Sequence, residues 1–204
     1  MKRVLEVFSC LLLLGTAIDT AFAQQQGGIA GSTGLPAQET ALFAGSGVCA
    51  RCHDGLLEDG VDVSPVTLWR ATMMGNSAKD PVWRAKVSAE GVALPDLKAA
   101  IEAKCLICHS PMLYRQSVYD GLDYSVADLV RSPLYRDGIS CTVCHQFQPA
   151  NFGLYESFSG GFWINDTRTI FGPYPNPMAG PMVNNSNYTP EEAYIASGTG
   201  WVIN

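Results

Sequence analysis

Basic residues and histidines are few in this sequence. The chain of 204 residues has 13 Lys and Arg against 19 Asp and Glu, giving a formal net charge of -6, and it has only three His. The shortage of basic residues argues against a protein that binds nucleic acid or an anionic membrane surface. A moderately acidic surface is compatible with a basic protein partner.

Long apolar runs are missing beyond the N-terminus. The chain starts with Lys2 and Arg3, continues through an apolar stretch over residues 4–18, and then reaches Ala21-Phe22-Ala23. This order predicts a secretory signal peptide over residues 1–23, because the stretch is short for a membrane span of about 20 residues. The alternative is a membrane anchor that is never cleaved. We therefore expect an exported, periplasmic protein with no stable membrane span after signal cleavage.

Cysteine is confined to one repeated pattern once Cys10 in the signal-peptide region is set aside. The other six Cys and all three His form three copies of C-x-x-C-H: Cys49-Ala-Arg-Cys52-His53, Cys105-Leu-Ile-Cys108-His109 and Cys141-Thr-Val-Cys144-His145. C-x-x-C-H is the attachment motif of c-type haem. Two thiols about one helical turn apart add to the two vinyl groups of one porphyrin, and the following His ligates the iron. The pattern predicts three covalently bound c-type haems, which these nine residues hold.

Other uses of paired cysteines explain the pattern less well. Three disulfides would suit an exported chain but would leave the His after each pair unexplained. A zinc site needs two pairs closer together than Cys52 and Cys105 are. A thioredoxin-like redox site would need a βαβ setting, which the sequence around these pairs does not predict.

The sequence also divides the chain into regions. Residues 24–45 are rich in Gln, Gly, Ser, Thr and Ala and predict a flexible N-terminal arm. Residues 46–204 form the predicted triple c-haem domain. The fold class that we expect is mainly α with long irregular loops and a small β-hairpin, organised around the haems, because the protein part has little continuous apolar pattern of its own.

Turn and capping residues predict where the elements lie. Helices are expected over residues 65–74, 81–91, 95–109 and 125–131, and Asp80-Pro81 provides a cap and a first-position proline for the second of them. A hairpin is expected within residues 158–171. Residues 172–190 are dense in Pro, Gly and Asn and predict irregular structure, and Thr189-Pro190-Glu191-Glu192 predicts the start of a last helix.

The residues around the motifs resemble a known family. Three runs carry the likeness: Trp69-Arg-Ala-Thr-Met-Met-Gly-Asn-Ser-Ala-Lys-Asp-Pro-Val-Trp-Arg-Ala-Lys-Val87, Cys105-Leu-Ile-Cys-His-Ser-Pro-Met112 and Asp137-Gly-Ile-Ser-Cys-Thr-Val-Cys-His-Gln146. Residues 45–182 thereby resemble multihaem c-type cytochromes related to the tetrahaem cytochromes of nitrifying bacteria. The resemblance implies closely packed haems, a mainly helical fold and electron transfer in the periplasm.

Two departures from that family limit what it implies. Relatives often carry a fourth C-x-x-C-H, which is absent here, and the chain stops where such a segment would continue. This is compatible with a short natural form or with a fragment truncated at the C-terminus. Many of the family's haems also take a second His, whereas every His of the mature chain is already used, so that assignment is not carried over.

Methionine is the next ligand to expect at the sixth position of each iron, because Met/His ligation is common in cytochromes c. Met73 and Met74 are neighbours on a predicted helix and point about 100° apart, so only one of them can face a given iron. The alternative for each Met is to fill a gap in the core. Weaker candidates are three lysines, and a ligand from a partner chain is a further alternative. The candidate methionines are Met73, Met74, Met112, Met178 and Met182, and the lysines are Lys79, Lys86 and Lys104.

Two functions follow from these residues. The first is electron transfer between redox protein partners through the haems, which requires no general acid or base, and we predict no catalytic residues. The second is a haem enzyme or sensor that has one open iron, where a small nitrogen or oxygen species binds as a small-molecule ligand. Scattered arginines are candidates to neutralise haem propionates or are simply solvated charges.

Overall fold

The computed structural model describes residues 34–193, so the predicted signal peptide and Cys10 lie outside the described residues. Helices dominate the described part and two small two-stranded sheets accompany them, which confirms the prediction of a mainly α chain with long loops. The α-helices are α2 (Ser46–His53), α3 (Pro65–Arg70), α4 (Met73–Asn76), α5 (Pro81–Ala93), α6 (Lys98–His109), α7 (Pro111–Asp120), α8 (Val126–Arg131), α9 (Cys141–Cys144) and α10 (Ala179–Ser186). The strands are β1 (Leu57–Glu58), β2 (Val61–Asp62), β3 (Thr169–Gly172) and β4 (Thr189–Glu192), and short 3-10 turns are η1 (Pro95–Leu97), η2 (Tyr135–Asp137) and η3 (Tyr155–Ser157). No helix within residues 34–193 is long and apolar enough to cross a membrane.

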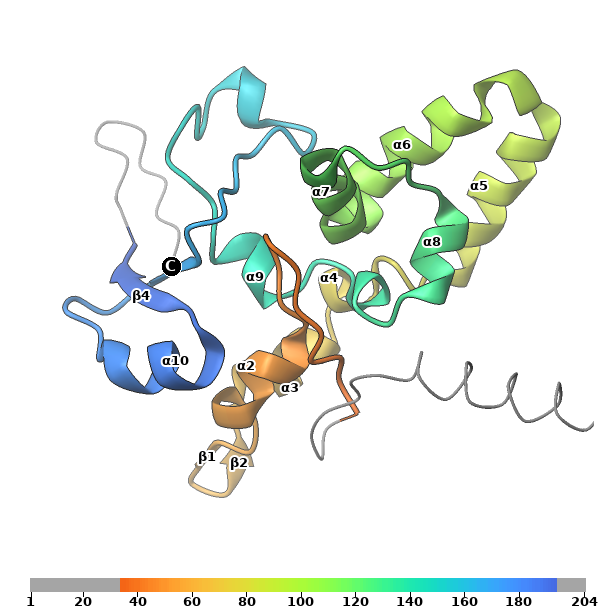
Figure 1. Ribbon diagram of the computed structural model, residues 1–204. Coiled ribbons are helices and arrows are strands. Elements are labelled where there is room, and N and C mark those ends of the chain that lie inside the picture. Colours follow the sequence, from red (N-terminus) through yellow and green to blue (C-terminus); the bar gives the residue numbers. More distant parts are fainter. Residues whose placement is uncertain (1–33, 194–204) are drawn as a thin grey trace, which may run out of the picture.

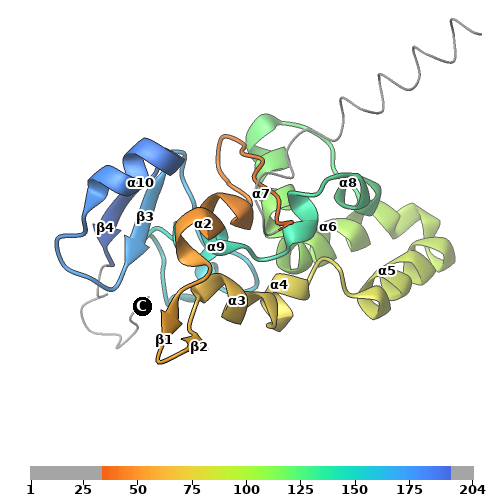
Figure 2. The ribbon, with the colours of Figure 1, turned by 90° about the horizontal axis from the view of Figure 1, so that it is seen from below.

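The elements form three groups around α9 (Figures 1 and 2). The antiparallel helices α5 and α6 lie on one side with α7 and α8, the unit of α10, β3 and β4 lies on the other, and α2 and α3 lie beside the β1–β2 hairpin. The described core is divided accordingly into small clusters. One cluster joins α5 to α8 through Trp83, Leu106 and Leu129, and another surrounds α9 through Phe43 and Val143.

The helices α5 and α8 form where capping residues predict them, whereas the helix expected over residues 95–109 is the 3-10 turn η1 followed by α6, which begins at Lys98 without a side-chain cap. The Asp80 side chain accepts hydrogen bonds from the first backbone N–H groups of α5, and Ser125 caps α8 in the same way. The predicted stop at Gly91 is wrong, because α5 continues to Ala93. Gly91 is instead a close-packing position, where a Cβ would come 3.1 Å from Lys98 Cγ at the start of α6.

The single helix predicted over residues 65–74 is two helices. Helix α3 ends at Arg70, and α4 starts anew at Met73 because the Thr72 hydroxyl accepts a hydrogen bond from Gly75 N at 3.2 Å. An N-cap inside the predicted segment thus restarts the helix. Helix α7 was not expected, although Pro111 at its first position and Gly121 in the left-handed conformation after its last are ordinary boundary residues.

The predicted positions of the β-structure and of the C-terminal helix are wrong. The antiparallel hairpin is β1–β2, whose two-residue turn places Asp59 and Gly60 at φ 50° and 79°. Within residues 158–171 a turn precedes β3, and β3 pairs in parallel with β4, so Thr189–Glu192 is a strand and not a helix start. Parallel strands need a crossover connection, and α10 supplies it inside the segment that was expected to be irregular.

The predicted flexible arm is also wrong for residues 34–45, the part of it that the structure describes. Phe43 and Ala44 are fully buried. Leu42 N donates to Gln116 Oε1 at 3.0 Å, and Ala44 O accepts from the Thr142 hydroxyl at 3.0 Å. The segment is therefore part of the core around α9, because buried side chains of distant helices satisfy its backbone groups.

Candidate functional site

Each of the three C-x-x-C-H motifs lies at the C-terminal end of a helix. His53 is the last residue of α2, His109 is the last residue of α6, and His145 directly follows the short helix α9. A helix places the two cysteines of a motif about one turn apart on one side, because residues three apart are neighbours on its surface. The local geometry that c-type haem attachment requires is therefore present in all three motifs.

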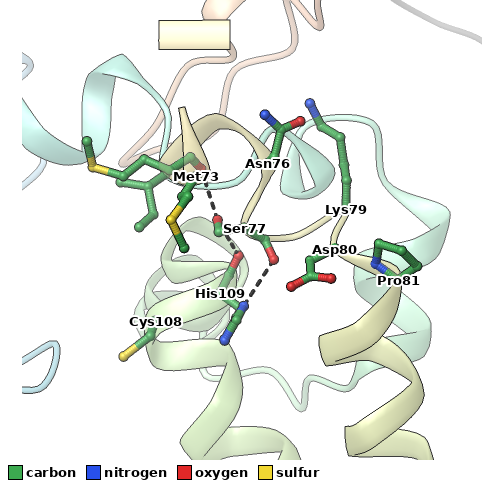
Figure 3. Close-up of a pocket in the computed structure, with 10 residues that line it drawn as sticks. Met73, Asn76, Ser77, Lys79, Asp80, Pro81, Cys108 and His109 are labelled. Atoms are coloured by element: carbon green, nitrogen blue, oxygen red, sulfur yellow. Dashed lines mark hydrogen bonds between the residues drawn. The ribbon is translucent and has the colours of Figure 1, made fainter. Parts of the chain in front are cut away.

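His109 is held by a reciprocal pair of hydrogen bonds with Ser77 (Figure 3). Its ring Nδ1 lies 3.0 Å from the Ser77 carbonyl oxygen, and the Ser77 hydroxyl donates to the His109 carbonyl at 3.0 Å. A carbonyl oxygen can only accept, so Nδ1 must carry the proton. The lone pair of Nε2 is left free to bind a metal, which is how second-shell carbonyls orient ligand histidines.

His145 has the same arrangement with a different partner. Its Nδ1 donates to the Phe171 carbonyl at 2.8 Å, and Phe171 N donates back to the His145 carbonyl at 2.8 Å. Phe171 lies in β3, so the unexpected parallel sheet positions the third motif. His53 differs, because its ring is exposed and forms no hydrogen bond within residues 34–193.

A cavity of about 560 Å³ opens beside the second motif. Its volume is within the range of roughly 300–1,000 Å³ that is usual for small-molecule and cofactor sites. Figure 3 shows Met73, Lys79 and Asp80 around it together with the motif residues Cys108 and His109. Met74 also lines this cavity, so the structure brings both members of the predicted methionine pair to the second motif.

The aromatic ring of Trp83 covers one face of His109. The two rings are stacked, with centroids 4.2 Å apart and planes within 4° of parallel, and Trp83 is 8% exposed. Its contact with the motif histidine was not foreseen, and the sequence has no signal for it.

The first and third motifs lie next to each other. Helices α2 and α9 are in contact, and the Cys49 and Cys141 thiols are within hydrogen-bonding reach. The Cys49 thiol donates to the sulfur of Cys141. This contact raises the pKa of Cys49, which holds its proton, and lowers the pKa of Cys141, whose thiolate it stabilises. Groups attached at Cys49 and Cys141 would therefore be neighbours.

The buried carboxylate of Asp137 joins the N-terminal ends of these two helices. Its oxygens accept from Ser46 N at 2.7 Å, from Ser46 Oγ at 3.0 Å and from Ser140 Oγ at 2.9 Å. Ser46 is the first residue of α2 and Ser140 precedes α9. Burial raises the pKa of Asp137, although these hydrogen bonds oppose the shift. The sequence analysis missed this residue, because its contact with Ser46 joins positions 91 residues apart.

The remaining candidate ligands are dispersed. Met112 is fully buried in the cluster around α9, Met178 is 80% exposed, and Met182 is half-buried against the cluster of Tyr188. Lys79 lines the cavity, Lys86 pairs with Glu90, and Lys104 is exposed.

All six cysteines of the motifs are free thiols. Within residues 34–193 no three His, Cys, Asp or Glu side chains lie close enough together to hold a metal ion.

Arg115 is a structural residue rather than a free cation. Its guanidinium donates to the carbonyls of Gly160 and Phe162, the latter at 2.7 Å, and it packs over the Phe162 ring. It therefore anchors the loop before β3 to α7.

Comparisons of this chain with protein-family models, with curated proteins and with solved structures find no match, and the likeness to multihaem cytochromes therefore stays a prediction.

Proposed function

We propose that this chain is an exported multihaem c-type cytochrome, which carries three covalent haems and transfers electrons between redox partners. The observation that carries the proposal is the fixed tautomer of His109 and His145. In both motifs a backbone carbonyl takes the Nδ1 proton, so Nε2 is presented as a ligand next to two free thiols. Histidines that bind no cofactor would not need Nδ1 bound to a carbonyl and Nε2 left free.

The surroundings of the motifs fit a large apolar group. The cavity beside His109 has the size of a cofactor site, and the hairpin and helix that follow the first motif expose apolar side chains to solvent. These side chains are Leu56, Leu57, Val61, Val63 and Leu68. Apolar side chains gathered on neighbouring elements are typical of a binding site, and this hairpin and helix directly follow Cys49 and Cys52, which would hold the first porphyrin.

The chain's own residues would hold the cofactors and set their electronic properties. Six cysteines would form the thioether bonds, and three histidines would provide the proximal ligands. The haem irons would supply one-electron chemistry, and ligand identity and hydrogen bonding around them set the potential. The contact between Cys49 and Cys141 brings two attachment sites together, which suits transfer between bound centres. The net charge of -6 fits basic redox partners.

The second candidate function is a haem enzyme or sensor with one open iron. All three histidines serve as proximal ligands in this proposal, so no imidazole remains for the opposite face. Met73 and Met74 reach the second motif in α4, which ends directly before Ser77 and hence approaches from the Nδ1 side of His109. Both methionines line the cavity, but Met73 is 89% exposed and Met74 is 46% exposed, so packing holds neither side chain in place as a ligand. The second site is therefore the candidate for an open iron.

The test is to produce the full chain with the c-type haem maturation machinery and to determine its intact mass and haem content. We expect three covalent haems, two after the paired change Cys105→Ala and Cys108→Ala, and three in the control Cys10→Ala. A matured protein that carries no covalent haem would overturn the proposal.

Electron paramagnetic resonance then separates the two functions. Low-spin irons that do not bind carbon monoxide after reduction indicate an electron carrier, and a high-spin iron that binds carbon monoxide indicates an open site.

A further inference from the structure

His109 is held by its place in the chain, by the Ser77 carbonyl and by the stacked ring of Trp83, and only the stacked ring controls the plane of the imidazole. The covalent chain places the residue at the end of α6, and the Ser77 carbonyl holds Nδ1 at 3.0 Å. Contacts at the two ring nitrogens, one to a carbonyl and one to a metal, still leave the ring able to rock about the line that joins them. A flat partner against the ring face removes this freedom.

Trp83 is that flat partner. Its ring lies 4.2 Å from the His109 ring at an angle of 4°, which is close stacking for an aromatic pair. Trp83 itself is firmly placed. It is buried in a cluster with Val87 and Leu106, and the carboxylate that caps the helix accepts its backbone N–H. The stacked face therefore cannot move independently of the packing between α5 and α6.

The other two motif histidines have no such partner in the described part of the chain. His145 has a carbonyl at Nδ1 but no stacked ring, and His53 has neither within residues 34–193. The second motif is thus the one whose ligand plane the described residues fix.

We propose that Trp83 is a positioning residue for the second haem site, which holds the plane of the His109 imidazole relative to the iron and thereby sets the electronic state of that haem. The inference rests on the proposed function. The orientation of a ligand ring controls its overlap with the iron orbitals, so the spectrum and the reduction potential of one haem depend on Trp83.

Two substitutions separate stacking from ordinary packing. Trp83→Phe keeps an aromatic face, and it breaks no hydrogen bond because the indole N–H has no partner among residues 34–193. Trp83→Leu keeps an apolar side chain but removes the face. The matched control is Trp163→Leu, because Trp163 is 57% exposed and makes no ring contact with a motif histidine in the described residues.

The measurements are haem content by mass, the resonance g-values and the midpoint potential of each haem. We expect three haems in every variant, a shift in the g-values and potential of a single haem in Trp83→Leu, a smaller shift in Trp83→Phe, and none in the control. Unchanged values in Trp83→Leu with three haems attached would overturn this inference alone. An unaltered protein without covalent haem would instead overturn the proposed function.

A second measurement uses the unaltered protein, in case Trp83→Leu does not accumulate. In the reduced haem-loaded form saturated with carbon monoxide, which makes an open iron low-spin and diamagnetic, nuclear Overhauser contacts should join the Trp83 indole protons to the ring protons of a ligand histidine. Their absence would show that the stack is not present beside the haem, and the inference would be wrong.

Discussion

At the scale of single residues, Asp137 links two helices that carry motif cysteines. Its carboxylate accepts three hydrogen bonds from Ser46 and Ser140, and it is almost fully buried. In Asp137→Ala the two hydroxyls can turn to other acceptors, but the buried Ser46 N–H is left without one. A buried donor that has lost its acceptor costs about 1–3 kcal/mol. We expect a loss of that size in the free energy of unfolding, measured by denaturant titration. Ser140→Ala, which removes a single donor, should cost less, and equal losses in the two variants would contradict this account.

The same carboxyl should make stability depend on pH. Burial raises the pKa of Asp137 above its ordinary value of 3.8, so the folded chain holds this proton more tightly than the unfolded chain does. The stability that this group contributes is therefore complete below pH 3.8 and is lost as the pH rises through the raised pKa. Asp137→Asn cannot ionise. Its free energy of unfolding, relative to that of the unaltered protein, should rise over this pH interval, and a relative free energy that falls there would show that the hydrogen bonds outweigh burial.

At the scale of elements, helix α5 depends on its first turn. Asp80 accepts from Val82 N at 2.8 Å and from Trp83 N at 3.4 Å, and Pro81 occupies the first position. Replacing an N-cap Asp by Ala costs about 1 kcal/mol. We expect Asp80→Ala to lose this amount by thermal or denaturant unfolding, whereas Asp96→Ala, in the exposed turn before α6, should lose much less. Similar losses in both variants would show that the cap is not what stabilises α5.

Capping residues also decide which elements the sequence predicts well. The start of α5 at Asp80-Pro81 and the start of α8 at Ser125 follow from local chemistry, and both predictions are confirmed. The β3–β4 sheet depends instead on pairing across the intervening helix α10, and a local pattern cannot encode that pairing. The burial of residues 34–45 depends likewise on acceptors and donors in distant helices, among them Gln116 and Thr142.

In the candidate site, too, the residues of a local motif could be predicted and the contacts between distant segments could not. The nine motif residues can be predicted from the sequence, because the spacing of C-x-x-C-H alone identifies them as candidates for haem attachment. The partners of the histidine rings do not follow from it. Ser77 and Phe171 contribute backbone carbonyls, which any residue type carries, and Trp83 reaches His109 from another helix. Tertiary packing alone brings these groups to the motifs.

At the scale of the whole molecule, the described protein part does not complete its own core. Its buried apolar residues fall into separate small clusters, and large apolar side chains such as Leu57, Leu68 and Met73 are more than half exposed. Covering apolar surface stabilises a fold by about 25 cal/mol per Å², so three bound porphyrins would add to the stability as well as supply the redox centres.

This view predicts how the chain behaves without haem. Protein made without the maturation machinery should bind a hydrophobic dye strongly, unfold at lower temperature and be cleaved faster by protease than the haem-loaded form, because the surface beside each motif stays open to water.

The paired change Cys49→Ala and Cys52→Ala tests this prediction at the first motif alone. Such a protein should mature with two haems, and its dye binding and its unfolding temperature should lie between those of the two forms, since only the surface around Leu57 and Leu68 is uncovered. If the haem-free chain instead matched the loaded protein in dye binding and in unfolding temperature, the core would be complete without porphyrin. The exposed side chains would then need another partner.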